Sequence, residues 1–60
     1  MNILLIDDDA ICNMIAETTL RRMGVANKIY IAMNGSEALA LFVERFPESQ
    51  QTPDVILLDL

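Results

Sequence analysis

Two short aliphatic runs that each end in aspartate do most to limit the folds open to this 60-residue chain. The first, Asn2–Ile6, is followed by three consecutive aspartates, and the second, Val55–Leu58, is followed by Asp59. Aliphatic runs of this length are typical of strands that are buried on both faces. The sequence therefore predicts two apolar strands whose carboxyl ends both carry acidic side chains.

The segment after the first run predicts a helix over residues 9–23. Asp9 is a good N-cap residue and Gly24 a good helix stop, and Glu17 and Arg21 are spaced as an i,i+4 ion pair. Asn13 lies with these two charged residues on the expected solvent face. The expected buried stripe comprises Cys12, Ile15, Ala16, Thr19, Leu20 and Met23.

A third strand and a second helix precede the second aliphatic run. Residues 28–33 are rich in β-forming side chains and predict an edge strand. Asn34, with Glu37 three residues later, is a variant of the capping box and begins a helix that extends to Phe46. Residues 47–54 are polar, include both prolines of the chain, and predict a surface loop.

The resulting order, strand, helix, strand, helix, strand, predicts an α/β fold with a parallel sheet. Crossover helices join parallel strands with right-handed connections. If the two aliphatic strands are neighbours, the strand order is 2-1-3 and the two helices lie on opposite faces. The chain then reverses direction at a topological switch point, where open parallel sheets bind ligands beyond the carboxyl ends of their strands.

The aspartates that end the two aliphatic strands meet at that edge. Asp7 and Asp8 follow the first strand and Asp59 follows the third, so we expect one shared acidic site. Neighbouring carboxylates raise one another's pKa unless a cation lies between them. Oxygen ligands of this kind suit Mg²⁺, and one carboxylate could act as a nucleophile towards phosphorus.

The charge balance and the absence of histidine exclude several functions. Nine acidic and four basic residues give a formal charge of -5, which disfavours binding to nucleic acid or to an anionic membrane. The chain has no histidine and one cysteine, so it has no His-dependent nucleophilic pair and no internal disulfide. No apolar run is long enough to span a bilayer, and we expect a cytoplasmic protein.

Three segments in register resemble the receiver domain of two-component response regulators. "LLIDDD" resembles its first strand and acidic pair, "NGSEAL" the start of its second helix, and "PDVILLDL" its third strand. The resemblance covers the whole chain, residues 1–60, and only the amino-terminal half of one such domain.

The resemblance implies a flavodoxin-like doubly wound fold and a signalling module rather than an enzyme. Asp59 would accept a phosphoryl group from a histidine kinase or a histidine phosphotransfer protein. Asp8 and Asp59 would bind Mg²⁺ directly, and Asp7 mainly through water. The family's hydroxyl residue and lysine belong to its second half, so we expect phosphotransfer by these 60 residues alone to be impaired.

Two other interpretations of the sequence remain open. "DDDAI" also fits a phosphatase of the haloacid dehalogenase type, in which Asp7 attacks phosphorus and Asp9 is the acid/base. A second alternative is a non-catalytic half-domain that self-associates, because an unpaired "VILLDL" strand is a flat hydrophobic edge. We expect self-association through this third strand under the receiver reading as well.

Overall fold

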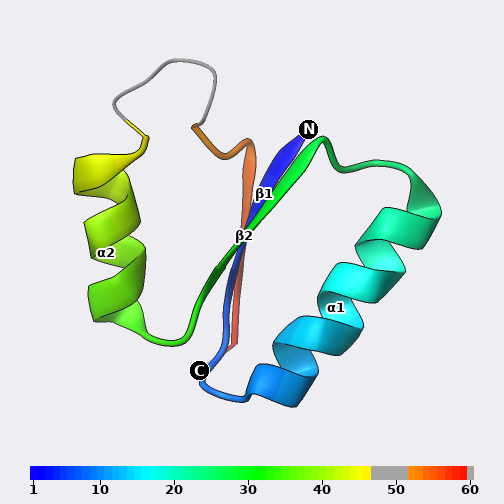
Figure 1. Ribbon diagram of the computed structural model, residues 1–60, viewed down its shortest axis with the longest axis horizontal. Helices are drawn as coiled ribbons and strands as arrows, with labels where there is room; N and C mark the ends of the chain where they lie inside the picture. Colours follow the sequence, from blue (N-terminus) through cyan, green and yellow to red (C-terminus); the bar gives the residue numbers. More distant parts are fainter. Residues whose placement is uncertain (47–51, 60) are drawn as a thin grey trace.

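Five elements alternate along the chain in the computed structural model, which describes residues 1–46 and 52–59. They are β1 (Asn2–Ile6), α1 (Ala10–Met23), β2 (Lys28–Ala32), α2 (Gly35–Glu44) and β3 (Val55–Leu58). The strands form one parallel sheet in the order β2-β1-β3, with α1 and α2 on opposite faces (Figure 1). This confirms the predicted α/β fold, half of a flavodoxin-like sheet with strand order 2-1-3.

The register aligns the three strands so that their carboxyl ends lie together. Ile6, the last residue of β1, is level with Ala32 of β2 and with Leu58 of β3. At the other end of the seam between β1 and β3, the backbone N–H of Asp54 donates to the carbonyl oxygen of Asn2 at 2.7 Å. The N–H of Asn2 donates in turn to the Asp54 carboxylate at 2.7 Å, which fixes where β3 begins.

Both helices begin with the predicted caps. The Asp9 carboxylate accepts hydrogen bonds from the N–H groups of Ile11 and Cys12 at 2.9 and 3.4 Å. The Asn34 side chain accepts from the N–H of Glu37 at 2.9 Å. Gly24 ends α1 with φ of 70°, in the left-handed region that favours glycine. The second helix ends at Glu44, two residues before the predicted end.

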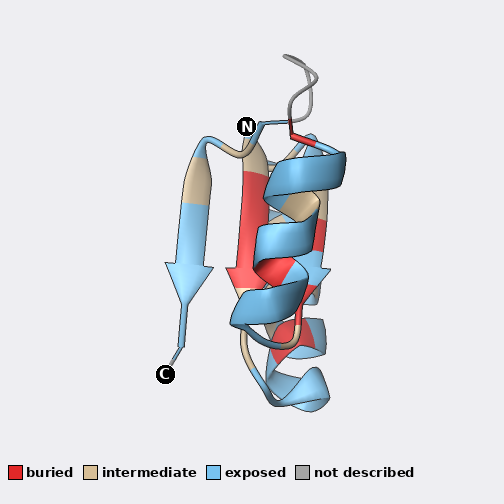
Figure 2. Cartoon of the chain, turned by 90° about the vertical axis from the view of Figure 1, so that its left-hand side faces the viewer, coloured by how far each residue is buried: buried red, intermediate tan, exposed pale blue. Residues whose placement is uncertain are grey.

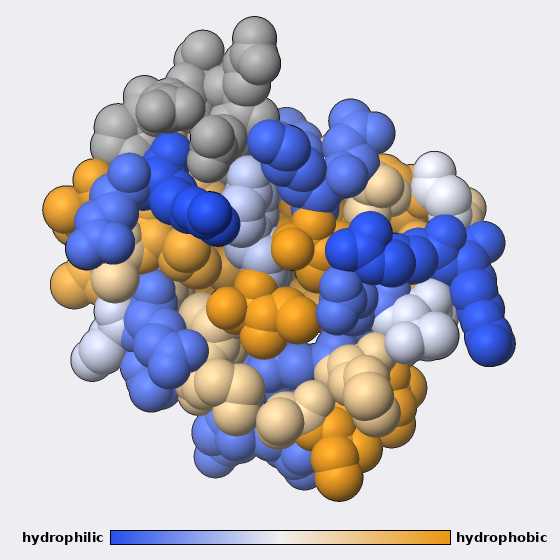
Figure 3. All heavy atoms as spheres, viewed as in Figure 1, coloured by the Kyte–Doolittle hydropathy of each residue, from blue (hydrophilic) through white to orange (hydrophobic). Residues whose placement is uncertain are grey.

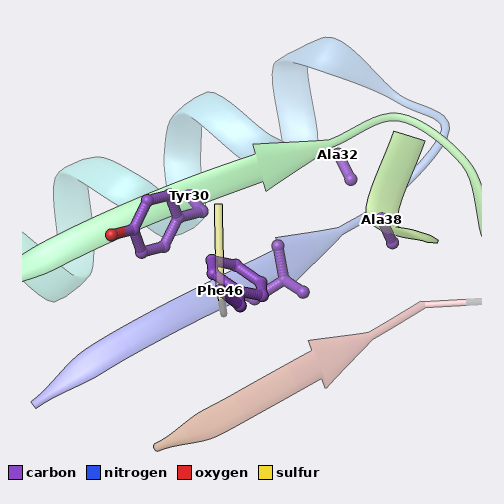
Figure 4. Close-up of a cluster of buried hydrophobic side chains, with 5 residues drawn as sticks. Tyr30, Ala32, Ala38 and Phe46 are labelled. Carbon is purple, nitrogen blue, oxygen red and sulfur yellow. The ribbon is translucent and has the colours of Figure 1, made fainter. Parts of the chain in front are cut away.

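The best packed part of the protein lies between the sheet and α2. A cluster of buried side chains fills it (Figure 4): Leu4, Tyr30, Ala32, Ala38 and Phe46. The ring of Phe46 meets the ring of Tyr30 edge to face, with centroids 5.0 Å apart. Ile6 and Leu41 pack against this cluster. On the other face of β1, Ile3 and Leu5 are also buried, 2% and 3% exposed.

The predicted inner face of α1 is wrong in part. Asn13, placed by the sequence analysis on the solvent face, is the buried residue of this helix and is 3% exposed. Cys12, Ile15 and Met23 are exposed. The half-buried positions Ala16 and Leu20 continue the stripe that begins at Asn13, so the helix is turned by about one residue from the predicted orientation. The polar side chain goes inward because it has hydrogen-bond partners there, which are described below.

The side chains of β3 are more exposed than those of β1. Ile56, Leu57 and Leu58 are 47%, 45% and 58% exposed, and Figure 2 shows β3 as a largely exposed strand beside the buried β1. Hydrophobic side chains also lie uncovered between hydrophilic ones on the face in Figure 3.

Within the part of the chain that is described, no helix has the length and apolar content needed to cross a bilayer.

Candidate functional site

Strand pairing brings Asp59 next to Asp7. Ile6 and Leu58 are partners in the register, so the residues that follow them leave the sheet side by side. The N–H of Asp59 donates to the carbonyl oxygen of Ile6 at 3.0 Å, which extends the pairing one residue beyond β3. The Asp59 side chain is therefore presented at the carboxyl edge of the sheet by backbone hydrogen bonds.

The backbone around Asp7 is fixed from both sides. Its N–H donates to the carbonyl oxygen of Ala32 at 3.1 Å, which ties it to the end of β2. Its carboxylate accepts the N–H of Asp9 at 2.9 Å, an Asx-turn contact that directs the chain into α1. This hydrogen bond occupies one oxygen of the Asp7 carboxylate and fixes the orientation of its side chain.

The acidic residues repel one another, as the sequence analysis expected. The negative charge of Asp7, a hydrogen bond between the carboxyl groups of Asp7 and Asp59, and smaller contributions from desolvation and Asp8 raise the pKa of Asp59. A bound cation would relieve this repulsion and lower that pKa. Asp7 and Asp59 also line one hollow together, where both carboxylates could meet a common ligand.

Two hollows flank Asp59. One, of about 290 Å³, lies on the α1 side and is lined by Asp7, Cys12, Asn13 and Leu57, among others. The other, of about 470 Å³, lies on the α2 side and is lined by Asp8, Met33 and Asn34, among others. Asp59 lines both, whereas Asp7 and Asp8 each line one. Asp59 is consequently the carboxylate that can be approached from either face of the sheet.

The three predicted metal ligands are not assembled into a ready cation site. Asp7 and Asp59 line the first hollow together, whereas Asp8 acts on Asp59 through its charge and lines the second hollow. Over residues 1–46 and 52–59, no three carboxylate or thiolate side chains are grouped so that they could hold a metal ion. The donor chemistry still fits a hard cation such as Mg²⁺, because all three side chains offer oxygen.

Cys12 lies at this edge without the properties of a reactive thiol. It was expected in the core and is exposed instead. The charge of Asp9, and to a smaller extent desolvation and the charges of Asp7 and Asp59, raise the pKa of its thiol. A raised pKa lowers the thiolate fraction at neutral pH, so the acidic surroundings oppose the activating effect of the helix N-terminus.

Asn13 is a residue of this site that was not predicted from the sequence. Its side-chain amide donates to the carbonyl oxygen of Asp7 at 2.9 Å and to the sulfur of Met33 at 3.4 Å. The spacing of Asn13, Ala16 and Leu20, i, i+3 and i+7, was a signal that could have placed it on the inner face. Asn13 was nevertheless expected on the solvent face because its side chain is polar.

Comparisons with known proteins give no family assignment. No protein-family model matches the chain, and neither a curated protein nor a solved structure matches it.

Proposed function

We propose that this chain is a phospho-acceptor receiver module of the two-component type, and that Asp59 takes up the phosphoryl group. The observation that carries the proposal is the position of Asp59: exposed, at the carboxyl edge beside the switch point, and next to Asp7. The resemblance of the three sequence segments to response regulators points to the same residue.

The chemistry requires a carboxylate oxygen that can approach phosphorus in line with the leaving group. A carboxylate oxygen of Asp59 attacks the phosphorus of a phosphohistidine on a histidine kinase or a histidine phosphotransfer protein. The new O–P bond forms as the N–P bond breaks, and the electron pair of that bond stays on the imidazole nitrogen. Both hollows beside Asp59 offer room for the donor's approach.

Mg²⁺ is the proposed cofactor, held by Asp7, Asp8 and Asp59. When bound, it neutralises the charge of the phosphoryl oxygens. The raised pKa of Asp59 supports this assignment, because uncompensated negative charge is what a cation would offset. Asp7 keeps its direction through the turn contact with Asp9, and Asp8 contributes charge from the α2 side.

Acetyl phosphate labelling tests the proposal directly. We expect slow, Mg²⁺-dependent labelling of the chain, detected after long incubation, mapped by peptide mass spectrometry to Asp59 and abolished in Asp59→Asn. Glu44→Gln is a control, since Glu44 is an exposed acidic residue at the end of α2, and it should be labelled as the wild type is. Absence of label from the wild-type chain would contradict the proposal.

Label on Asp7 would instead support the haloacid dehalogenase reading. That reading needs Asp9 as a free acid/base, whereas the Asp9 carboxylate already accepts the N–H groups of Ile11 and Cys12. Taking Asp9 away from this cap would expose two helix N–H groups. The capping contact therefore favours Asp59 as the nucleophile over Asp7.

We also propose that the chain self-associates through β3. This strand pairs with β1 on one side, and three consecutive aliphatic side chains on it are exposed. An exposed, flat, apolar strand edge is a template for pairing with another copy. A formal charge of -5 on each copy opposes contact, so added salt should strengthen the association.

Sedimentation velocity over a dilution series tests the association. We expect the wild type to sediment as a dimer or larger species that dissociates on dilution. Ile56→Lys should shift it to monomer, because a lysine on the edge would be forced into the contact. Leu39→Lys, on an exposed position of α2, should behave as the wild type. A folded wild-type monomer that is insensitive to dilution would contradict the proposal.

A further inference from the structure

Asn13 stands out because it is a polar side chain in an apolar position. Among the described residues it is the buried amide, 3% exposed, and it faces the sheet from the first turn of α1. Burial of an amide side chain is unfavourable unless its donors and acceptors are paired. For packing alone, a leucine at this position would serve at a lower desolvation cost. The reason for asparagine must lie in the hydrogen bonds that it makes.

The stronger of these hydrogen bonds fixes a peptide group at the centre of the acidic site. The Nδ2 atom of Asn13 donates to the Asp7 carbonyl oxygen at 2.9 Å. That carbonyl shares a planar peptide group with the N–H of Asp8. Holding the oxygen therefore also fixes the direction of the Asp8 N–H and the point from which the Asp8 side chain departs.

The second hydrogen bond joins this loop to the other face of the site. The same Nδ2 atom lies 3.4 Å from the sulfur of Met33. Met33 follows β2 and lines the hollow on the α2 side together with Asp8, and Asn13 lines the hollow on the α1 side together with Asp7. One side chain of α1 thus contacts the segments that follow both β1 and β2.

We propose that Asn13 is a positioning residue of the acidic site: by holding the Asp7–Asp8 peptide group it sets how Asp7 and Asp8 are presented to a divalent cation. The inference rests on the proposed function, since the cation belongs to that proposal. Partners that orient the ligands of a metal are worth roughly 10- to 100-fold in affinity when they are removed. Asn13 acts in this way through the backbone carbonyl and does not itself bind the cation.

The test compares Asn13→Leu with the wild type by two measurements. Mn²⁺ binding, followed by calorimetry, should weaken by about tenfold in Asn13→Leu. In the absence of metal, the Asp8 amide resonance should shift or broaden in the two-dimensional NMR spectrum and exchange faster with solvent. Asn13→Gln, which keeps the donor, should recover part of the Mn²⁺ affinity.

Two further variants separate positioning from a loss of stability. Leu20→Ala removes a half-buried side chain from the same helix, and should lower the unfolding midpoint without changing Mn²⁺ affinity in the folded chain. Met33→Leu keeps the volume and removes the sulfur acceptor, so its Mn²⁺ affinity should fall less than that of Asn13→Leu. If Asn13→Leu reduced Mn²⁺ affinity no more than Leu20→Ala does, the inference would be wrong.

The outcome also distinguishes this inference from the proposed function. A wild-type chain that binds Mn²⁺ and is labelled on Asp59, with an unchanged Asp8 amide in Asn13→Leu, would overturn the role of Asn13 alone. A wild-type chain that neither binds Mn²⁺ nor accepts label would overturn the proposed function, and the role of Asn13 with it.

Discussion

The two sides of β1 differ sharply, although β1 pairs in parallel with a strand on each side. On the β2 side, α2 covers the sheet, and Tyr30 and Phe46 close a buried cluster around Leu4. On the β3 side the strand is held by its pairing with β1, and its aliphatic side chains remain exposed. The protein thus has a covered half, comprising β1, β2 and α2, and an open half, which contains β3.

The buried apolar core and the candidate nucleophile therefore lie in different halves of the protein. Burial of apolar side chains supplies the main stabilising free energy, and most of it lies in the covered half. The candidate nucleophile Asp59 lies at the end of the open strand. A carboxylate in that position is accessible to a large phosphoryl donor, which a buried one would not be. The cost is an apolar edge that favours association.

The largest expected contrast is between leucines of the two halves. Leu4→Ala removes a side chain that is 0% exposed and should cost about 2–5 kcal/mol in the free energy of unfolding. A 60-residue domain has only about 3–9 kcal/mol in total, so much of this variant should be unfolded. Leu58→Ala, at a position 58% exposed, should change the free energy by about 0.5 kcal/mol or less.

Urea titration monitored by circular dichroism measures both variants. It should be carried out at a concentration at which the wild type is monomeric, because association would add a contribution from Leu58. Equal destabilisation by the two substitutions would remove the distinction between a covered and an open half.

A smaller effect is expected at the start of α1, where caps and hydrogen bonds compensate for sparse burial. Asp9→Ala removes the acceptor for two N–H groups and should cost about 1 kcal/mol. Asp9→Ser keeps a capping oxygen and should preserve most of the stability. Both substitutions remove the charge that contributes most to raising the pKa of Cys12, so that pKa should fall in both.

Thermal unfolding and the pH dependence of Cys12 alkylation check these expectations. The comparison with Asp9→Ser separates the cap from the charge. An unchanged alkylation profile in both variants would mean that the charge of Asp9 does not control the thiol.

The smallest effect concerns Asp59 and depends on pH. Because the pKa of Asp59 is raised in the folded state, the folded chain binds more protons than the unfolded chain between the ordinary and the raised pKa. Stability therefore falls as pH rises through this window, and the full penalty is present above it. Asp59→Asn should raise the unfolding midpoint at neutral pH, with the gain lost below the ordinary carboxyl pKa.

Asp54→Asn is the matched comparison at the other end of β3. Its carboxylate accepts the N–H of Asn2 at 2.7 Å, so this substitution should lower the midpoint at neutral pH. Denaturant titrations of both variants over a pH series measure the difference. A loss of stability in Asp59→Asn at neutral pH would contradict the repulsion between Asp59 and Asp7.

The order of the elements, the helix caps and the edge at which the aspartates lie follow from local sequence patterns. These features depend on local chemistry: aliphatic runs favour strands, Asp9 and Asn34 cap helices, and parallel strands bring their carboxyl ends to one edge. Asp7 and Asp59 could therefore be expected at one edge from the sequence, because each directly follows one of two parallel strands expected to be neighbours. The register that places Ile6 opposite Leu58 comes from the structure.

The buried face of α1 and the contacts that hold each aspartate depend on tertiary packing, which local sequence patterns do not predict. A helix with apolar residues around much of its circumference has several possible inner faces, and the choice depends on partners far away in sequence. Asn13 turns inward because the Asp7 carbonyl and the Met33 sulfur lie there to receive its amide protons. Periodicity gives the spacing of a stripe along a helix, whereas the hydrogen-bond acceptors on the sheet select which stripe faces it.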